Sequence, residues 1–149
     1  MMLQNHILAS YFIYKAFPNP LIGIPLSFAS HYVLDTVSYP SKEMEISLQS
    51  EMASNRDKVT FAFTISFLIL TSTIVLFLIA KKNEFNFKFI IYMISANLPD
   101  IYGQIIPILK GKRKEALDGH KFELTHNPYI KIFLNQMLTL TGIFYLIIK

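Results

Sequence analysis

The sequence predicts an all-α integral membrane protein, a single domain of about five helices over residues 1–149. Hydrophobic residues make up 52% of the chain and charged residues only 16%, whereas a soluble domain has about 25% charged residues. The run from Val59 to Ala80 contains no charge, and about 20 apolar residues suffice to cross the hydrocarbon of a bilayer. Apolar runs of the same kind occupy much of the remaining chain.

The first two helices are predicted over residues 3–17 and 21–39 as a helical hairpin. Pro18-Asn19-Pro20 forms the turn between them, because proline and asparagine favour turns. The first arm is short for a full crossing, so a tilted, interfacial or re-entrant position is open for it. The charge-free segment 59–80 is the third helix.

The fourth helix is predicted over residues 87–109, and Pro99 and Pro107 kink or break it. Proline lacks the backbone N–H of the helical ladder and clashes with the preceding turn. The fifth helix covers residues 128–148, and Pro128 suits its first position.

Two polar stretches connect these segments. Residues 42–56 carry Met44, Leu48 and Met52 at spacings of four, which predicts a short amphipathic helix on the membrane surface. Residues 110–127 are basic and contain glycine, which indicates a loop. Nine of the 14 lysine and arginine residues fall on the side of these two stretches. That side is therefore expected to be cytoplasmic, with the N-terminus inside and the C-terminus outside.

Six ionisable residues from four separate stretches reach this cytoplasmic face in the predicted topology. They are His6, His31, Asp35, Asp100, His120 and His126. A carboxylate inside a membrane costs at least about 2.5–3.5 kcal/mol on insertion scales, so two at one depth need a partner or a cation. His31 and Asp35 are four residues apart and share a helix face, which is workable spacing for two ligands of one metal.

Each candidate also has a purely structural interpretation. His31 and Asp35 would form an interhelical hydrogen-bonded pair, Asp100 would pair with Lys110 or a backbone amide, and His126 would cap the last helix. The chain contains no cysteine, so a metal would depend on imidazole and carboxylate. Those ligands suit zinc, manganese or iron.

Four short motifs carry a family resemblance. They are Asn5-His6, Ser30–Asp35 (SHYVLD) followed by Tyr39-Pro40, Asn97–Asp100 (NLPD), and His120–His126 (HKFELTH). Together they resemble the motifs of the bacterial predicted membrane-bound metal-dependent hydrolases, the YdjM-like group. The resemblance implies a divalent-metal site, and this group has been likened to bacterial zinc-dependent phospholipase C.

The leading hypothesis is a membrane-embedded metal-dependent hydrolase at the cytoplasmic face of the cell membrane. The expected metal ligands are His6, His31, Asp35, Asp100 and His126, and Asp100 and His120 are the expected catalytic residues, with His120 a ligand or a proton shuttle. Zinc is the expected metal, with manganese and iron as alternatives. The expected partners are membrane lipids and a lipid-like or phosphodiester substrate, and nucleic acid is not expected. Two alternatives stay open: non-enzymatic metal or ion handling, and a structural or regulatory role with a partner protein.

Overall fold

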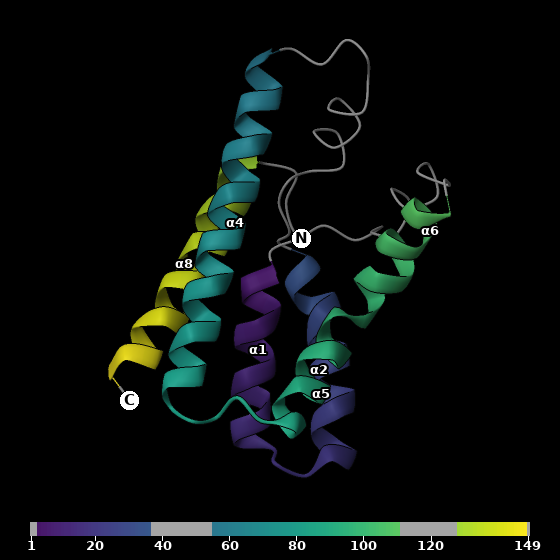
Figure 1. Cartoon of the computed structure of the whole chain (residues 1–149), viewed down its shortest axis with the longest axis vertical. Coiled ribbons are helices and arrows are strands. Elements are labelled where there is room, and N and C mark those ends of the chain that lie inside the picture. Colours follow the sequence, from purple (N-terminus) through teal and green to yellow (C-terminus); the bar gives the residue numbers. More distant parts are fainter. Residues whose placement is uncertain (1–2, 37–54, 111–127, 149) are drawn as a thin grey trace.

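The described regular structure is entirely helical, which confirms the predicted all-α class. The computed structural model describes residues 3–36, 55–110 and 128–148 (Figure 1). The helices are α1 (Leu3–Ala16), α2 (Pro20–Asp35), α4 (Asn55–Lys81), α5 (Phe87–Asp100), the π-helix η1 (Ile101–Ile105), α6 (Ile106–Leu109) and α8 (Pro128–Ile148). Most of the predicted surface helix 42–56 and basic loop 110–127 lies outside the described residues.

The predicted membrane crossings are not found among these helices. Within residues 3–36, 55–110 and 128–148, no helix combines the length and the apolar character that crossing a membrane requires.

α1 is the central helix. It contacts α2 and α5 on one side and α4 and α8 on the other, as Figure 1 shows. α1 and α2 form the predicted antiparallel hairpin, and the Asn19 side chain begins α2 by accepting a 3.0 Å hydrogen bond from the Leu21 amide. α5 runs in the same direction as α2, so the start of α1 lies beside the ends of α2 and α5.

The lower half of this three-helix unit is held by direct contacts between α5 and the hairpin. The Tyr92 hydroxyl donates to the Phe17 carbonyl at 2.8 Å, and the Ser95 hydroxyl donates to the Ile24 carbonyl at 3.0 Å. The Tyr92 ring packs directly on Gly23, where a β-carbon would overlap it. These contacts fix the height of α5 against α2, and with it the position of the last residue of α5.

Hydrogen bonds within a buried polar cluster connect α8 to α1. The Asn5 amide donates to the Asn135 side-chain oxygen at 2.9 Å, and the Thr139 hydroxyl donates to the Asn5 side-chain oxygen at 2.9 Å. All three side chains are buried. The sequence separation of 130 residues between the two asparagines makes this a purely tertiary contact.

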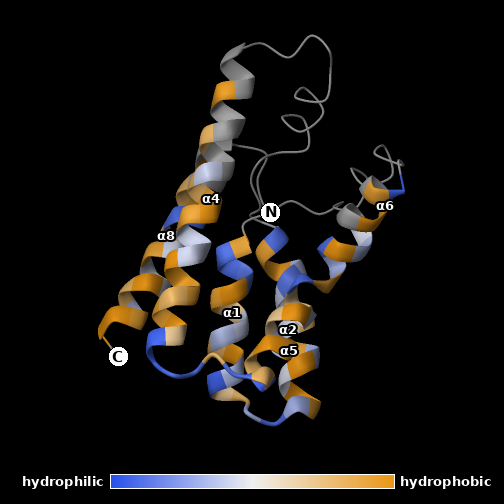
Figure 2. Cartoon of the chain, viewed as in Figure 1, coloured by the Kyte–Doolittle hydropathy of each residue, from blue (hydrophilic) through white to orange (hydrophobic). Residues whose placement is uncertain are grey.

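Apolar side chains face outward over much of the molecule, while many polar ones are inside. Figure 2 shows hydrophobic residues along α8, α2 and α5, and hydrophilic residues where the tops of α1 and α2 meet the end of α5. The apolar core consists of Ile7, Leu8, Tyr11, Val75, Ile79, Phe89 and Leu146. The buried polar residues are Gln4, Asn5, His6, Ser10, Ser27, His31, Asp35, Thr71, Ser72, Ser95, Asp100, Asn135 and Thr139.

Candidate metal centre

Three helices bring four of the predicted site residues together. His6 lies in the first half of α1, His31 and Asp35 lie in the last two turns of α2, and Asp100 is the last residue of α5. The antiparallel hairpin places the start of α1 beside the end of α2, and the parallel α5 ends at the same level. His120 and His126 lie outside the described residues.

Asp35 connects the two histidines. Its Oδ1 atom lies 3.2 Å from His6 Nε2, and its Oδ2 atom lies 2.9 Å from His31 Nε2. The other ring nitrogen of His31, Nδ1, lies 3.7 Å from Asp100 Oδ2. His31 is therefore at the centre of the group, with one carboxylate on each side of its ring.

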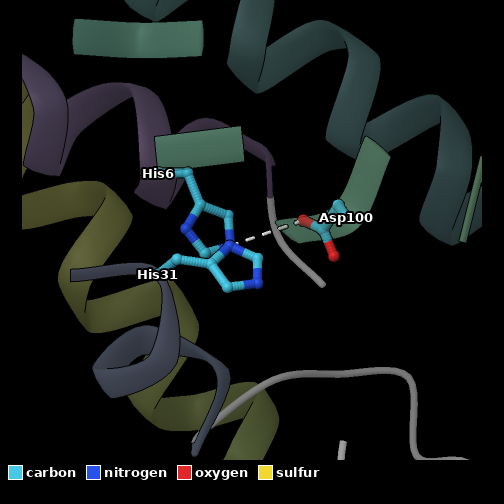
Figure 3. A group of neighbouring side chains, drawn as sticks. All are labelled: His6, His31 and Asp100. Atoms are coloured by element: carbon cyan, nitrogen blue, oxygen red, sulfur yellow. Dashed lines mark ion pairs between the residues drawn. The ribbon is translucent and has the colours of Figure 1, made fainter. Parts of the chain in front are cut away.

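The two imidazole rings are stacked, with centroids 4.7 Å apart and planes 21° from parallel. Figure 3 shows both rings beside the Asp100 carboxylate, with the His31–Asp100 pair as a dashed line. One ligand atom from each of His6, His31 and Asp100 lies within 4.8 Å of the others. Ligand atoms on one tetrahedral zinc are about 3.4 Å apart, given bonds of about 2.1 Å, so small side-chain movements would close the group around an ion.

Burial and charge favour a cation in this group. The four residues are at most 5% exposed. Isolated charges are costly to bury, and buried charges are normally paired or bound to a metal. Asp35 and Asp100 bring two carboxyl groups into this buried group, and a divalent cation would bind between them and the imidazoles. The donor set of imidazole nitrogen and carboxylate oxygen also suits zinc, manganese or iron.

The helix geometry changes directly after Asp100. α5 ends there, and the chain continues as the π-helix η1, in which the Ile106 amide donates to the Ile101 carbonyl. Pro99 lacks the N–H that would complete the preceding turn. π-Helical segments are rare and occur frequently at functional sites. The interruption predicted from Pro99 and Pro107 is therefore present as a change from α to π geometry between these two prolines.

Sequence patterns did not identify two buried serines that lie one turn from the histidines. Ser10 follows His6 by four residues, and Ser27 precedes His31 by four. The spacing of four between each serine and its histidine could have identified them, since residues four apart share a helix face.

An apolar groove of about 350 Å³ lies between α1 and α8 and shares no residue with the metal centre. Its lining consists of Phe12, Leu134, Met137, Leu138, Thr141, Gly142 and Tyr145.

No family model, curated protein or solved structure matches the chain. The resemblance to the YdjM-like group therefore depends on the four motifs alone.

Proposed function

We propose that this protein binds a divalent metal, with zinc the expected ion, and acts as a metal-dependent hydrolase at a membrane interface. The observation that carries the proposal is the convergence of two imidazoles and two carboxylates from three helices in one buried group. His6, His31, Asp35 and Asp100 are the proposed ligand residues. His126 as a further ligand and His120 as a ligand or proton shuttle belong to the proposal on sequence grounds.

The chemistry of the four residues fits hydrolysis. A bound divalent metal would polarise a phosphoryl or acyl oxygen and make water acidic near neutral pH. Asp35 contacts both imidazoles, and a carboxylate in this position orients a ligating histidine and raises its basicity. Asp100, on the far side of His31, would bind the metal or accept a proton from water.

The proposed location is the cytoplasmic face of the cell membrane, and the proposed substrate is a lipid-like phosphodiester. The charge-free segment 59–80 and the outward-facing apolar residues support a lipid environment. The basic residues Lys110, Lys112 and Arg113 follow α6 in the sequence, and basic segments next to a membrane attract anionic headgroups. Retention of the protein in membranes washed at alkaline pH tests the location.

The metal content of the purified protein tests the site. We expect about one zinc, manganese or iron ion per chain in the wild type after reconstitution. His31→Ala and Asp35→Asn should both lose it, because each removes a group at the centre of the cluster. Glu84→Gln is the matched control, since it neutralises a carboxylate in the α4–α5 connection, and it should keep the metal. A wild type that stays metal-free with all three ions contradicts the proposal.

One observation favours a second candidate, non-enzymatic metal binding. All four side chains are buried, and closed sites are typical of structural metals, whereas catalytic sites keep an open position. Metal-loaded protein should be assayed with bis(p-nitrophenyl) phosphate and with phospholipid vesicles. Turnover that Asp35→Asn abolishes supports the hydrolase, and full metal occupancy without turnover supports the second candidate.

A further inference from the structure

The apolar groove between α1 and α8 is long and narrow. Its α8 wall runs from Leu134 to Tyr145, which is about 16 Å along the helix axis. Its volume of about 350 Å³ lies within the range of roughly 300–1,000 Å³ that is usual for ligand pockets. Met137 and Leu138 on this wall are each 44% exposed, so the groove is open along its side. An extended hydrocarbon chain fits an apolar space of this shape.

A buried glycine and an aromatic pair shape the groove. A β-carbon at Gly142 would lie 2.6 Å from Leu8 Cδ1, so the glycine allows α1 and α8 to approach each other there. The rings of Phe12 and Tyr145 meet edge to face, with centroids 5.1 Å apart, at the end of the groove toward the end of α8. A protein helix is about 10–12 Å across with its side chains. It would therefore insert only single side chains, whereas a hydrocarbon chain would lie along the whole groove.

Positive charge lies directly beyond the aromatic end of the groove. Lys15 follows Phe12 by three residues on α1, which puts it on the same helix face about 4.5 Å further along the axis. Tyr145 is close enough to Lys15 for the two side chains to interact electrostatically. The Lys15 side chain is half exposed, so its ammonium group is accessible from the end of the groove.

Glu84 balances only part of this charge. Its carboxylate accepts a 2.9 Å hydrogen bond from Lys15 Nζ, and Lys82 also interacts with it electrostatically, so one carboxylate faces two ammonium groups. Figure 1 shows the α4–α5 connection at the same end of the molecule as the last turns of α1 and α8. In Figure 2 the end of α4 and this connection are hydrophilic, while α8 is hydrophobic. The excess positive charge is complementary to an anionic headgroup.

We propose that the groove and the lysines beyond it bind one anionic phospholipid, with an acyl chain along the groove and the phosphate at Lys15 and Lys82. A hydrocarbon chain joined to an anionic phosphate matches both features at once. The site lies at the opposite end of α1 from His6, so the lipid is a bound component of the fold and is distinct from the proposed substrate. The inference goes beyond the proposed hydrolase and requires no metal.

Two matched pairs of variants test the two parts of the site. Thr141→Trp places a large ring in the groove, whereas Leu140→Trp places the same ring at the neighbouring exposed position, which does not line it. Lys82→Gln removes one charge of the basic cluster. Lys88→Gln removes an exposed charge on α5, which contacts α1 and α2 but, among the described helices, not α8.

Native mass spectrometry of the detergent-purified protein in EDTA counts the lipids retained per chain and gives the oligomeric state. Phosphatidylglycerol and phosphatidylcholine with the same acyl chains are the probes. We expect the wild type to retain one phosphatidylglycerol in preference to phosphatidylcholine, and Thr141→Trp to lose both lipids. Lys82→Gln should lower the preference for phosphatidylglycerol by about fivefold, the effect of one basic residue near anionic headgroups. Leu140→Trp and Lys88→Gln should match the wild type. Met137→Trp replaces Thr141→Trp if that variant does not fold.

The proposal is overturned if the wild type retains neither lipid or retains both equally, or if Leu140→Trp loses lipid as fully as Thr141→Trp does. It is also overturned if the wild type is a lipid-free dimer that Thr141→Trp dissociates, because the groove would then be the contact between two copies of the chain. Metal content is a separate measurement, so failure of the lipid site leaves the proposed metal centre untouched.

Discussion

Gly23 is the residue of α2 on which the Tyr92 ring of α5 packs. Its missing side chain allows the Tyr92 ring to lie against the α2 backbone and its hydroxyl to reach the Phe17 carbonyl. His31 and Asp100 lie two turns further along the same two helices, where His31 Nδ1 and Asp100 Oδ2 are 3.7 Å apart.

Gly23→Ala should therefore destabilise the fold by about 1–3 kcal/mol, the usual cost of overpacking. Two other glycines serve as controls. An alanine at Gly142 meets the Leu8 methyl Cδ1 at 2.6 Å, which a flexible side chain can relieve in part, and an alanine at Gly103 meets nothing within 4 Å. Denaturant unfolding should rank the losses in the order Gly23, Gly142, Gly103, and Gly103→Ala should be neutral or slightly stabilising. Equal losses at all three positions would refute the close-contact explanation.

At the scale of the elements, the connection between α4 and α5 attaches both helices to α1. α4 ends at Lys81, and Asn83 adopts a positive φ of 54°, a conformation that commonly follows a helix. Asn86 accepts from the Phe89 amide at 3.0 Å to begin α5, and it donates to the Tyr14 hydroxyl at 2.9 Å. Glu84 forms a 2.9 Å ion pair with Lys15.

The ion pair gives the stability of this connection a pH dependence. Burial raises the pKa of Glu84, but hydrogen bonds from Lys15 and Tyr11 outweigh it and hold the pKa below its ordinary 4.5. A carboxyl with a lowered folded-state pKa stabilises the fold above its unfolded pKa, and this contribution is lost as pH falls through the folded value. The pair is partly exposed, so its contribution is about 0–1 kcal/mol.

Glu84→Gln should consequently lower the unfolding free energy by up to about 1 kcal/mol at pH 7, and the difference from wild type should shrink as pH falls below 4.5. Added salt should shrink it as well, because salt screens exposed charges. Denaturant unfolding at several pH values measures both effects. A difference that grows on acidification would show that the charge interaction has been assigned wrongly.

At the scale of the whole molecule, the main feature of the described residues is that many polar side chains are buried and many large apolar side chains are exposed. Imidazoles, carboxylates, amides and hydroxyls are buried, while large apolar side chains such as Leu21, Ile69, Phe77 and Phe144 are exposed. Large exposed apolar patches mark interaction or membrane surfaces in proteins. Interhelical hydrogen bonds such as Asn5–Asn135 are typical of helices that pack within a bilayer.

Ile69→Lys tests the proposed lipid contact. Ile69 is 63% exposed and lies near the middle of the charge-free segment, where a lysine costs about 2.5–3.5 kcal/mol on insertion scales. We expect a smaller fraction of this variant in alkaline-washed membranes. Phe85→Lys is the control, since Phe85 is also exposed but lies in the α4–α5 connection, and it should be retained as well as the wild type. Detergent-free solubility of both variants, with unchanged unfolding, would contradict the membrane location.

Local signals account for the part of the fold that the sequence predicted. The helical class follows from long apolar runs, the hairpin from Pro18-Asn19-Pro20, and the change of helix geometry after Asp100 from Pro99 and Pro107. Each of these depends on residues near one another in the chain. The shared face of His31 and Asp35 likewise follows from a spacing of four. The five predicted membrane crossings depended on the length and apolar character of each segment alone. No described helix meets the requirement for crossing.

What the sequence by itself determined is which segments are helical and which ionisable residues lie near one end of the hairpin. Only the tertiary structure decided how they meet: Asp35 bridging two stacked imidazoles, Asp100 beside His31, and Asn5 bonded to Asn135 across 130 residues. Periodicity along one helix fixes which side chains share its face, but the rotation and height of one helix against another depend on side-chain packing between distant segments.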